Sequence, residues 1–150
     1  MNDVKQIGNR YAVGMAPPSS EDLSQLARTG YKSVVNLRCE NEPDAPMTPQ
    51  LEGEKATALG LEYRNIPVAG DALTGDLVDR FRDCVKSLPG PLFVHCASGK
   101  RAGAFTIMHV AAENDLSGDA ALAQAQEMGF ACDQPALAEF VRDYIDAQRG

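Results

Sequence analysis

The residues best suited to chemistry in this chain lie between an apolar run and a helix-forming run, in the segment PLFVHCASGKRAG. Cys96 follows the apolar run, and a loop of small residues separates it from Arg101. Such a loop at a helix start turns successive backbone N–H groups inward, and the helix dipole adds positive potential at the same place. The sequence therefore predicts an anion-binding loop in which Cys96 is a nucleophilic thiolate.

The residues inside this loop have types that suit anion binding. Gly99 allows a positive φ angle and a close approach of the backbone to a ligand, while Ala97 and Ser98 are small enough to leave N–H groups accessible. Arg101 offers a planar fork of N–H donors to two oxygens of a phosphoryl or sulfuryl group. We expect residues 97–101 to bind an oxyanion beside the sulfur atom.

Two neighbours of the loop each have two interpretations. His95 is either a histidine that supports the end of its strand, or one that tunes the electrostatics of the loop. Lys100 either helps to attract an anion or is a solvated surface charge at a helix start. The sequence leaves both questions open.

The composition restricts the partners and the location of the protein. The 150 residues fit one domain, 1–150, and 44% of them are hydrophobic, as is usual for a globular chain. A net charge of −7 disfavours nucleic acid and acidic membrane surfaces as partners, and no apolar run reaches the ~20 residues that span a bilayer. The N-terminus lacks the apolar core of a signal peptide, so we expect a cytoplasmic protein. The oligomeric state is not indicated.

The four cysteines indicate free thiols rather than a metal site. They are widely spaced and form no C-x-x-C pair, so we expect neither a metal nor another cofactor. Cys39 and Cys84 are interpreted as inert thiols. A protective disulfide between Cys39 and Cys96 under oxidation is the less favoured alternative.

The segments around the loop alternate between strand-forming and helix-forming patterns. The expected strands are 11–15, 33–37, 61–68 and 91–95. A first helix starts after Ser19 or Ser20 and ends before Gly30, and further helices are expected near 49–59, 76–87, 101–114, 119–128 and 134–148, the last opened by Asp133. This alternation predicts an α/β fold with a central, mainly parallel sheet and helices on both faces. Ligand sites of such sheets lie beyond the carboxyl ends of the strands, where the Cys96 loop falls.

Three segments together resemble the superfamily of cysteine-dependent protein tyrosine and dual-specificity phosphatases. They are the loop HCASGKRAG, the strand and acidic loop GYKSVVNLRCENEP, and the strand and loop LEYRNIPVAGD. The chain is more similar still to a bacterial branch of that fold, the phosphatase-like domain found alone or fused to β-lactamase-like hydrolases. That branch shares the Ile-Pro-Val stretch and an arginine five positions after the cysteine. The resemblance covers most of the chain.

The resemblance implies hydrolysis of phosphate monoesters of a protein or a small molecule, with a role for each matching residue. Cys96 would attack phosphorus and form a phosphocysteine, Arg101 and the loop N–H groups would bind the equatorial oxygens, and His95 would orient the loop. Asp71, in the loop after the strand LEYRNIPV, would protonate the leaving group and then activate water. Asp71 is displaced from the family's pattern, so Asp76 remains the alternative acid.

The loop departs from the usual phosphatase signature in two ways. Four residues separate Cys96 from Arg101, where that signature has five, and rhodanese-type sulfurtransferases use the shorter count with a cysteine persulfide. Ala102 stands where phosphatases usually carry Ser or Thr to hydrogen-bond the leaving thiolate. A sulfurtransferase or persulfide carrier is therefore the alternative function, and an oxyanion-binding module with weak turnover is the third.

Residues outside the loop are interpreted as structural. We expect Arg38 to form an ion pair with Glu40 or Glu42, with a position toward the site as the less favoured alternative. We expect the acidic stretch 40–44 to be a solvated loop. His109 falls on the apolar helix after the loop and is interpreted as a histidine at the edge of the core rather than a ligand.

Overall fold

The strands form a five-stranded sheet that is parallel except at one edge. The computed structural model describes residues 4–40, 42, 45–69, 73–129 and 135–149. The strand order is β1-β2-β5-β3-β4, with β1 antiparallel to β2 and every other neighbouring pair parallel. The strands are β1 Val4–Ile7, β2 Tyr11–Gly14, β3 Ser33–Asn36, β4 Glu62–Asn65 and β5 Leu92–His95. The expected α/β fold with a mainly parallel sheet is confirmed.

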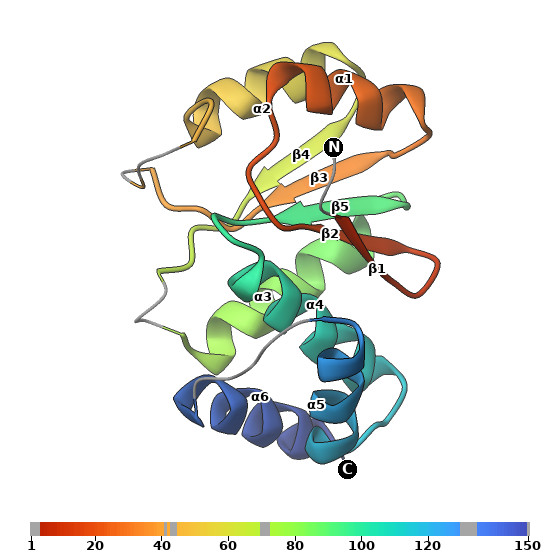
Figure 1. Ribbon diagram of the computed structural model, residues 1–150, viewed down its shortest axis with the longest axis vertical. Helices are drawn as coiled ribbons and strands as arrows, with labels where there is room; N and C mark the ends of the chain where they lie inside the picture. The colour runs from red at the N-terminus through yellow and green to blue at the C-terminus, as the bar shows by residue number, and fades with distance from the viewer. Residues whose placement is uncertain (1–3, 41, 43–44, 70–72, 130–134, 150) are drawn as a thin grey trace.

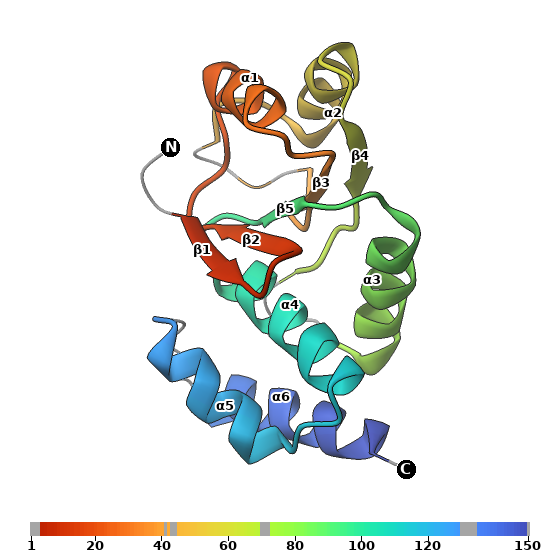
Figure 2. The ribbon, with the colours of Figure 1, turned by 90° about the vertical axis from the view of Figure 1, so that its right-hand side faces the viewer.

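Helices cover both faces of this sheet, as expected from the alternating pattern. Figure 1 and Figure 2 show α1 and α2 on one face and α3 and α4 on the other, with α5 and α6 packed beyond α4. The helices are α1 Ser20–Arg28, α2 Pro49–Ala58, α3 Gly75–Ser87, α4 Lys100–Glu113, α5 Gly118–Glu127 and α6 Pro135–Gln148. Within the described ranges, none of these helices has the length and apolar character needed to cross a membrane.

Side-chain caps start several of the helices, and one of them is at Ser19, as predicted. Ser19 Oγ accepts the N–H of Asp22, and the Asp22 carboxylate accepts the N–H of Ser19, which completes a capping box. Equivalent N-cap bonds are made by Thr48, Thr74 and Ser117. The bounds of α2 to α5 agree with expectation to within one residue at each end. The expected opening of the last helix at Asp133 lies outside the described residues.

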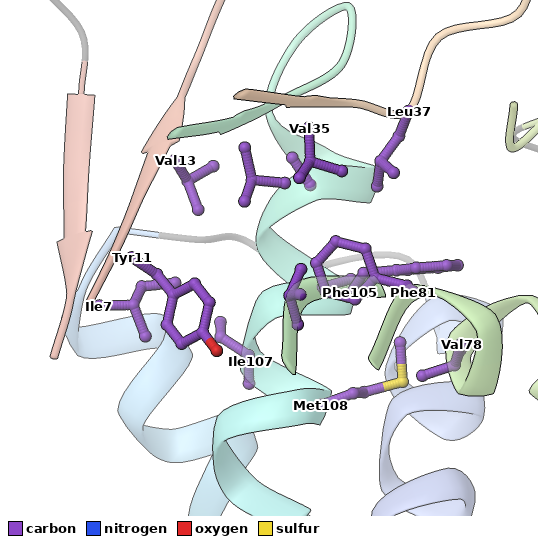
Figure 3. Close-up of a cluster of buried hydrophobic side chains, with 14 of the residues drawn as sticks. Ile7, Tyr11, Val13, Val35, Leu37, Val78, Phe81, Phe105, Ile107 and Met108 are labelled. Carbon is purple, nitrogen blue, oxygen red and sulfur yellow. The ribbon is translucent and has the colours of Figure 1, made fainter. Parts of the chain in front are cut away.

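Most buried apolar side chains lie between the sheet and the α3–α4 layer. Figure 3 shows Val13, Val35 and Leu37 from the sheet side facing Phe81 of α3 and Phe105 of α4. Burying side chains of this size stabilises a fold by about 1.5–3 kcal/mol each. This packing fixes α4 against the sheet, and with it the helix start that follows the Cys96 loop.

Alternation along β5 separates His95 from Cys96. Leu92 and Val94 join the cluster on the α3–α4 side, whereas Phe93 joins the cluster on the α1–α2 side. His95 lies on the same side as Phe93, with their ring centroids 5.8 Å apart, and Cys96 joins the α3–α4 cluster. The two adjacent residues therefore project into opposite layers of the protein.

Candidate active site

Cys96 directly follows β5, and its side chain is fully buried. Its Sγ accepts the N–H of Gly99 at 3.2 Å and the N–H of Ala102 at 3.4 Å. Both donors belong to the start of α4, so the sulfur lies at the positive end of that helix dipole. These two donors and the helix N-terminus place positive potential around the sulfur. The predicted proximity of the cysteine to the loop N–H groups is confirmed for these two.

The turn that aims these donors depends on Gly99. This residue is the N-cap of α4 and has a φ of 89°, a left-handed conformation that side chains disfavour. A Cβ atom at Gly99 would lie 2.6 Å from Met15 Sδ and 3.2 Å from Met15 Cα. Ala97, Ser98 and Lys100 are exposed around this turn. The loop is thus open to solvent on one side and tightly packed on the other.

Arg101 is held by a carboxylate from the acidic loop that follows β3. Its Nη1 donates to Glu42 Oε2 and its Nη2 donates to Glu42 Oε1, both at 2.7 Å. Nη1 also donates to the carbonyl of Val68 at 2.6 Å. A guanidinium has a second bidentate edge, formed by Nε–H and the remaining Nη2–H. No described residue accepts a hydrogen bond from that second edge.

The Glu42 carboxylate is stabilised as an anion in this position. The hydrogen bonds from Arg101 lower the pKa of Glu42 to about 2, and the N–H of Cys39, which donates to Oε2 at 2.6 Å, acts in the same direction. The same pair raises the pKa of Arg101. Glu42 was expected to lie in a solvated loop, and that expectation is wrong, because its side chain is only 19% exposed.

Arg38 does not form the expected side-chain ion pair among the described residues. It is buried, and its guanidinium donates to the backbone carbonyls of Glu42 at 2.9 Å and Met47 at 3.4 Å. These bonds hold the main chain of the loop from within, while the Glu42 side chain turns to Arg101 instead. The physical reason is burial. A buried guanidinium can donate to the main-chain carbonyls around it, whereas the carboxylate of an exposed residue such as Glu40 stays in the solvent.

The segment after β4 runs alongside the end of β3 and reaches Arg101. Ile66 N–H donates to Asn36 O at 2.9 Å and Val68 N–H to Leu37 O at 3.0 Å, so the chain follows β3 up to the carbonyl that binds Arg101. Asp71, the first candidate acid, follows soon after but lies outside the described residues. Asp76, the alternative, is exposed in the first turn of α3.

His95 faces away from the loop and binds a buried acid in the α1–α2 layer. Its Nε2 lies 2.6 Å from Oε2 of Glu52, in the first turn of α2, and both side chains are almost fully buried. The other ring nitrogen, Nδ1, has no hydrogen-bond partner in the described part of the chain. No local sequence pattern marks Glu52 as buried, since an acidic residue in the first turn of a helix is usually solvated there.

The remaining titratable residues considered in the sequence analysis are His109, Cys39 and Cys84, and the contacts of each indicate a structural role. His109 is buried, as expected, with Nδ1 accepting from Arg82 Nε at 3.2 Å, and burial lowers its pKa to about 4. Cys39 and Cys84 are free thiols whose pKa values are raised by burial, which fits the prediction that they are inert. In the part of the chain that the structure describes, no cluster of His, Cys, Asp and Glu could hold a metal ion.

Comparisons with known proteins match most of the chain. The family model for the phosphatase-like domain of β-lactamase hydrolase-like protein matches residues 3–113. The β-lactamase hydrolase-like protein of Xylella fastidiosa is 34% identical over 101 residues, which are 66% of this chain and 23% of that protein. The chain thus spans less than a quarter of the length of this curated relative.

Solved structures show the same fold at low sequence identity. TpbA of P. aeruginosa, in complex with pTyr, has a TM-score of 0.75 at 20% identity and covers 97% of this chain and 87% of its own. The core catalytic domain of the PP-IP phosphatase SIW14 of S. cerevisiae has a TM-score of 0.71 at 18% identity, with coverages of 92% and 82%. The fold is therefore that of protein tyrosine phosphatase-like enzymes.

Proposed function

Since the chain belongs to the family of phosphatase-like domains of β-lactamase hydrolase-like proteins, we propose that it is a cysteine-dependent phosphatase acting on phosphate monoesters. The observation that carries this proposal is the position of Cys96 Sγ, which accepts two N–H groups at the start of the helix that bears Arg101. The nucleophile works only as a reduced thiolate, so we also propose a cytoplasmic location.

The proposed reaction has two displacements at phosphorus. The Cys96 thiolate attacks phosphorus, and the P–O bond to the leaving group breaks. Asp71, or Asp76 as the alternative, donates a proton to the departing alkoxide or phenoxide. The resulting carboxylate then takes a proton from water, whose oxygen attacks the phosphocysteine and releases inorganic phosphate and the thiolate.

Charge on the phosphoryl oxygens is stabilised by the loop in this proposal. Glu42 occupies one edge of the Arg101 guanidinium and leaves the Nε–Nη2 edge for two phosphoryl oxygens. The N–H groups of residues 97–100 supply further donors, and preorganised donors of this kind account for most of the catalysis in phosphoryl transfer.

The residue after Arg101 has no hydroxyl group, but its backbone N–H contacts the sulfur. The N–H of Ala102 donates to Cys96 Sγ. We propose that this donor stabilises the thiolate when it leaves phosphorus in the second step. His95, on the opposite side of β5, is proposed to orient the loop rather than to touch the phosphoryl group.

As substrate we propose an aryl phosphate monoester such as phosphotyrosine, free or in a protein. Support comes from the similar fold of TpbA in complex with pTyr. The net charge of −7 and the Glu42 carboxylate beside Arg101 disfavour polyphosphorylated substrates, which carry several negative charges.

A sulfurtransferase remains the second candidate because four residues separate Cys96 from Arg101. In that reaction the thiolate attacks the outer sulfur of thiosulfate, the S–S bond breaks, and sulfite leaves. Cyanide then takes the outer sulfur of the Cys96 persulfide as thiocyanate and regenerates the thiolate.

One paired assay separates the candidates. Wild type, Cys96→Ser and the control Cys84→Ser are incubated with an aryl phosphate, or with thiosulfate plus cyanide. We expect phosphate release from the wild type and Cys84→Ser but not from Cys96→Ser. Thiocyanate formation without phosphate release would overturn the proposal in favour of the sulfurtransferase. If neither product forms while phosphate raises the melting temperature, the protein is an oxyanion-binding module.

A further inference from the structure

On the side of β5 opposite Cys96, an acid and a histidine are paired in the buried interior of the α1–α2 layer. Glu52 Oε2 lies 2.6 Å from His95 Nε2, and the two side chains are 1% and 0% exposed. We infer that Glu52 is a positioning residue for the nucleophile loop: it fixes the ring of His95, and His95 immediately precedes Cys96. The catalytic meaning of this inference rests on the function proposed above.

The surroundings of Glu52 are built for a buried carboxylate. It lies in the first turn of α2, where the helix dipole favours negative charge. Asn36 Nδ2 lies 3.5 Å from Oε1 and donates more closely, at 3.0 Å, to the hydroxyl of Tyr63, which donates in turn to the carbonyl of Pro49. This network joins Asn36 at the end of β3 and Tyr63 in β4 to the acid that holds His95.

The approach of α2 to the sheet depends on the residue after Glu52. A Cβ atom at Gly53 would lie 2.8 Å from Cδ2 of Tyr63, so only glycine lets the helix pack this closely on β4. Because α2 packs this closely, the Glu52 carboxylate reaches His95 at the end of β5. A buried acid–histidine pair adds little stability over apolar residues of the same volume, which points to a positioning role for Glu52.

Among the described residues, Glu52 is the only hydrogen-bond partner of the His95 ring, and it therefore controls how the ring lies. Nδ1 has no partner among the residues that the structure describes, so the contact at Nε2 alone selects the ring orientation and places a proton on Nε2. The main chain of His95 leads into the loop, with its carbonyl accepting the N–H of Leu37 at 2.9 Å. Without the Glu52 contact the ring can turn, and Cys96 then shifts relative to the N–H of Gly99. This shift weakens the hydrogen bond that the sulfur accepts.

The test compares Glu52→Gln with Glu54→Gln, a matched control on the exposed face of the same helix. Peptide mass spectrometry measures how fast iodoacetamide alkylates Cys96 at neutral pH. We expect the rate to fall about ten-fold or more in Glu52→Gln and to stay at the wild-type value in Glu54→Gln. Proton NMR of the wild type should show a strongly downfield imidazole N–H signal that is lost in His95→Asn and in Glu52→Gln.

Alkylation of a folded Glu52→Gln variant at the wild-type rate would overturn the inference, and so would absence of the downfield signal from the wild type. If Glu52→Gln does not fold, Glu52→Asp takes its place, because it keeps the charge but is one methylene too short to hold the ring. Neither readout needs turnover. A wild type that fails to hydrolyse aryl phosphate therefore refutes the proposed function while the alkylation and NMR results still decide the role of Glu52.

Discussion

Replacing Glu42 by Gln removes the charge that holds Arg101, and the structure gives the expected cost. The pKa of Glu42 falls from an ordinary 4.5 to about 2 on folding. At 1.36 kcal/mol per pKa unit, this difference stabilises the fold by roughly 3 kcal/mol at pH 7, and solvent screening of the partly exposed pair reduces it. We therefore expect Glu42→Gln to lower the free energy of unfolding by about 1–3 kcal/mol at pH 7.

The pH dependence of this loss separates the ion pair from simple packing. A carboxylate with a lowered pKa stabilises the folded state above its unfolded pKa, and the contribution fades as pH falls from about 4.5 toward 2. Urea titrations at pH 7 and pH 3 measure the difference in free energy of unfolding between wild type and Glu42→Gln. This difference should be smaller at pH 3 than at pH 7, by roughly half or more. The control Glu40→Gln, at an exposed position in the same loop, should match wild type at both pH values.

A difference between wild type and Glu42→Gln that stays constant between pH 7 and pH 3 would refute this reasoning, because Gln has the same size but no titration. An unchanged free energy of unfolding at pH 7 would refute it as well. Either result would mean that the bidentate contact with Arg101 does not form in solution.

Three further outcomes follow from the same geometry. Arg101→Lys should lower kcat/KM toward an aryl phosphate about 100-fold or more, since an ammonium cannot offer two parallel donors, and steady-state kinetics that keep wild-type values would contradict the proposed role. Gly99→Ala should destabilise the protein by about 1–3 kcal/mol in thermal melts and abolish most activity, whereas Gly8→Ala, which has a positive φ but open space around it, should cost less and keep activity. His109 has a pKa lowered to about 4, so its neutral form stabilises the fold above its ordinary pKa of 6.5, and the contribution is lost as pH falls toward 4. From pH 7 to pH 5 the wild type should therefore lose about 1–2 kcal/mol more stability than His109→Gln, and equal losses would exclude this residue as the cause.

The elements of the fold could be read from the sequence because their signals are local. Caps such as Ser19 and Thr48 and the breakers after each helix lie within a few residues of the boundaries that they set. The Cys96 loop was equally local, since the cysteine, the glycine and the helix start are consecutive. These are the parts of the site that the sequence predicted.

The carboxylates that bind Arg101 and His95 could not be predicted, because each depends on a contact made far along the chain. Glu42 meets Arg101 across 59 positions and Glu52 meets His95 across 43, and nothing near either glutamate marks it as the partner of that residue. Arg38 was assigned an acidic partner nearby, but its buried guanidinium bonds to main-chain carbonyls instead. Tertiary packing, rather than local pattern, decides where such charges lie.

Trapping the covalent intermediate tests most directly whether Cys96 is the nucleophile. Wild type is mixed with an excess of aryl phosphate and quenched in acid during turnover, and the peptide that contains Cys96 is examined by mass spectrometry. The mechanism predicts a phosphate adduct on Cys96 in the wild type. The Cys96→Ser variant should show neither the adduct nor phosphatase activity. Phosphate release by a Cys96→Ser variant at the wild-type rate, with no adduct on the wild-type cysteine, would contradict it.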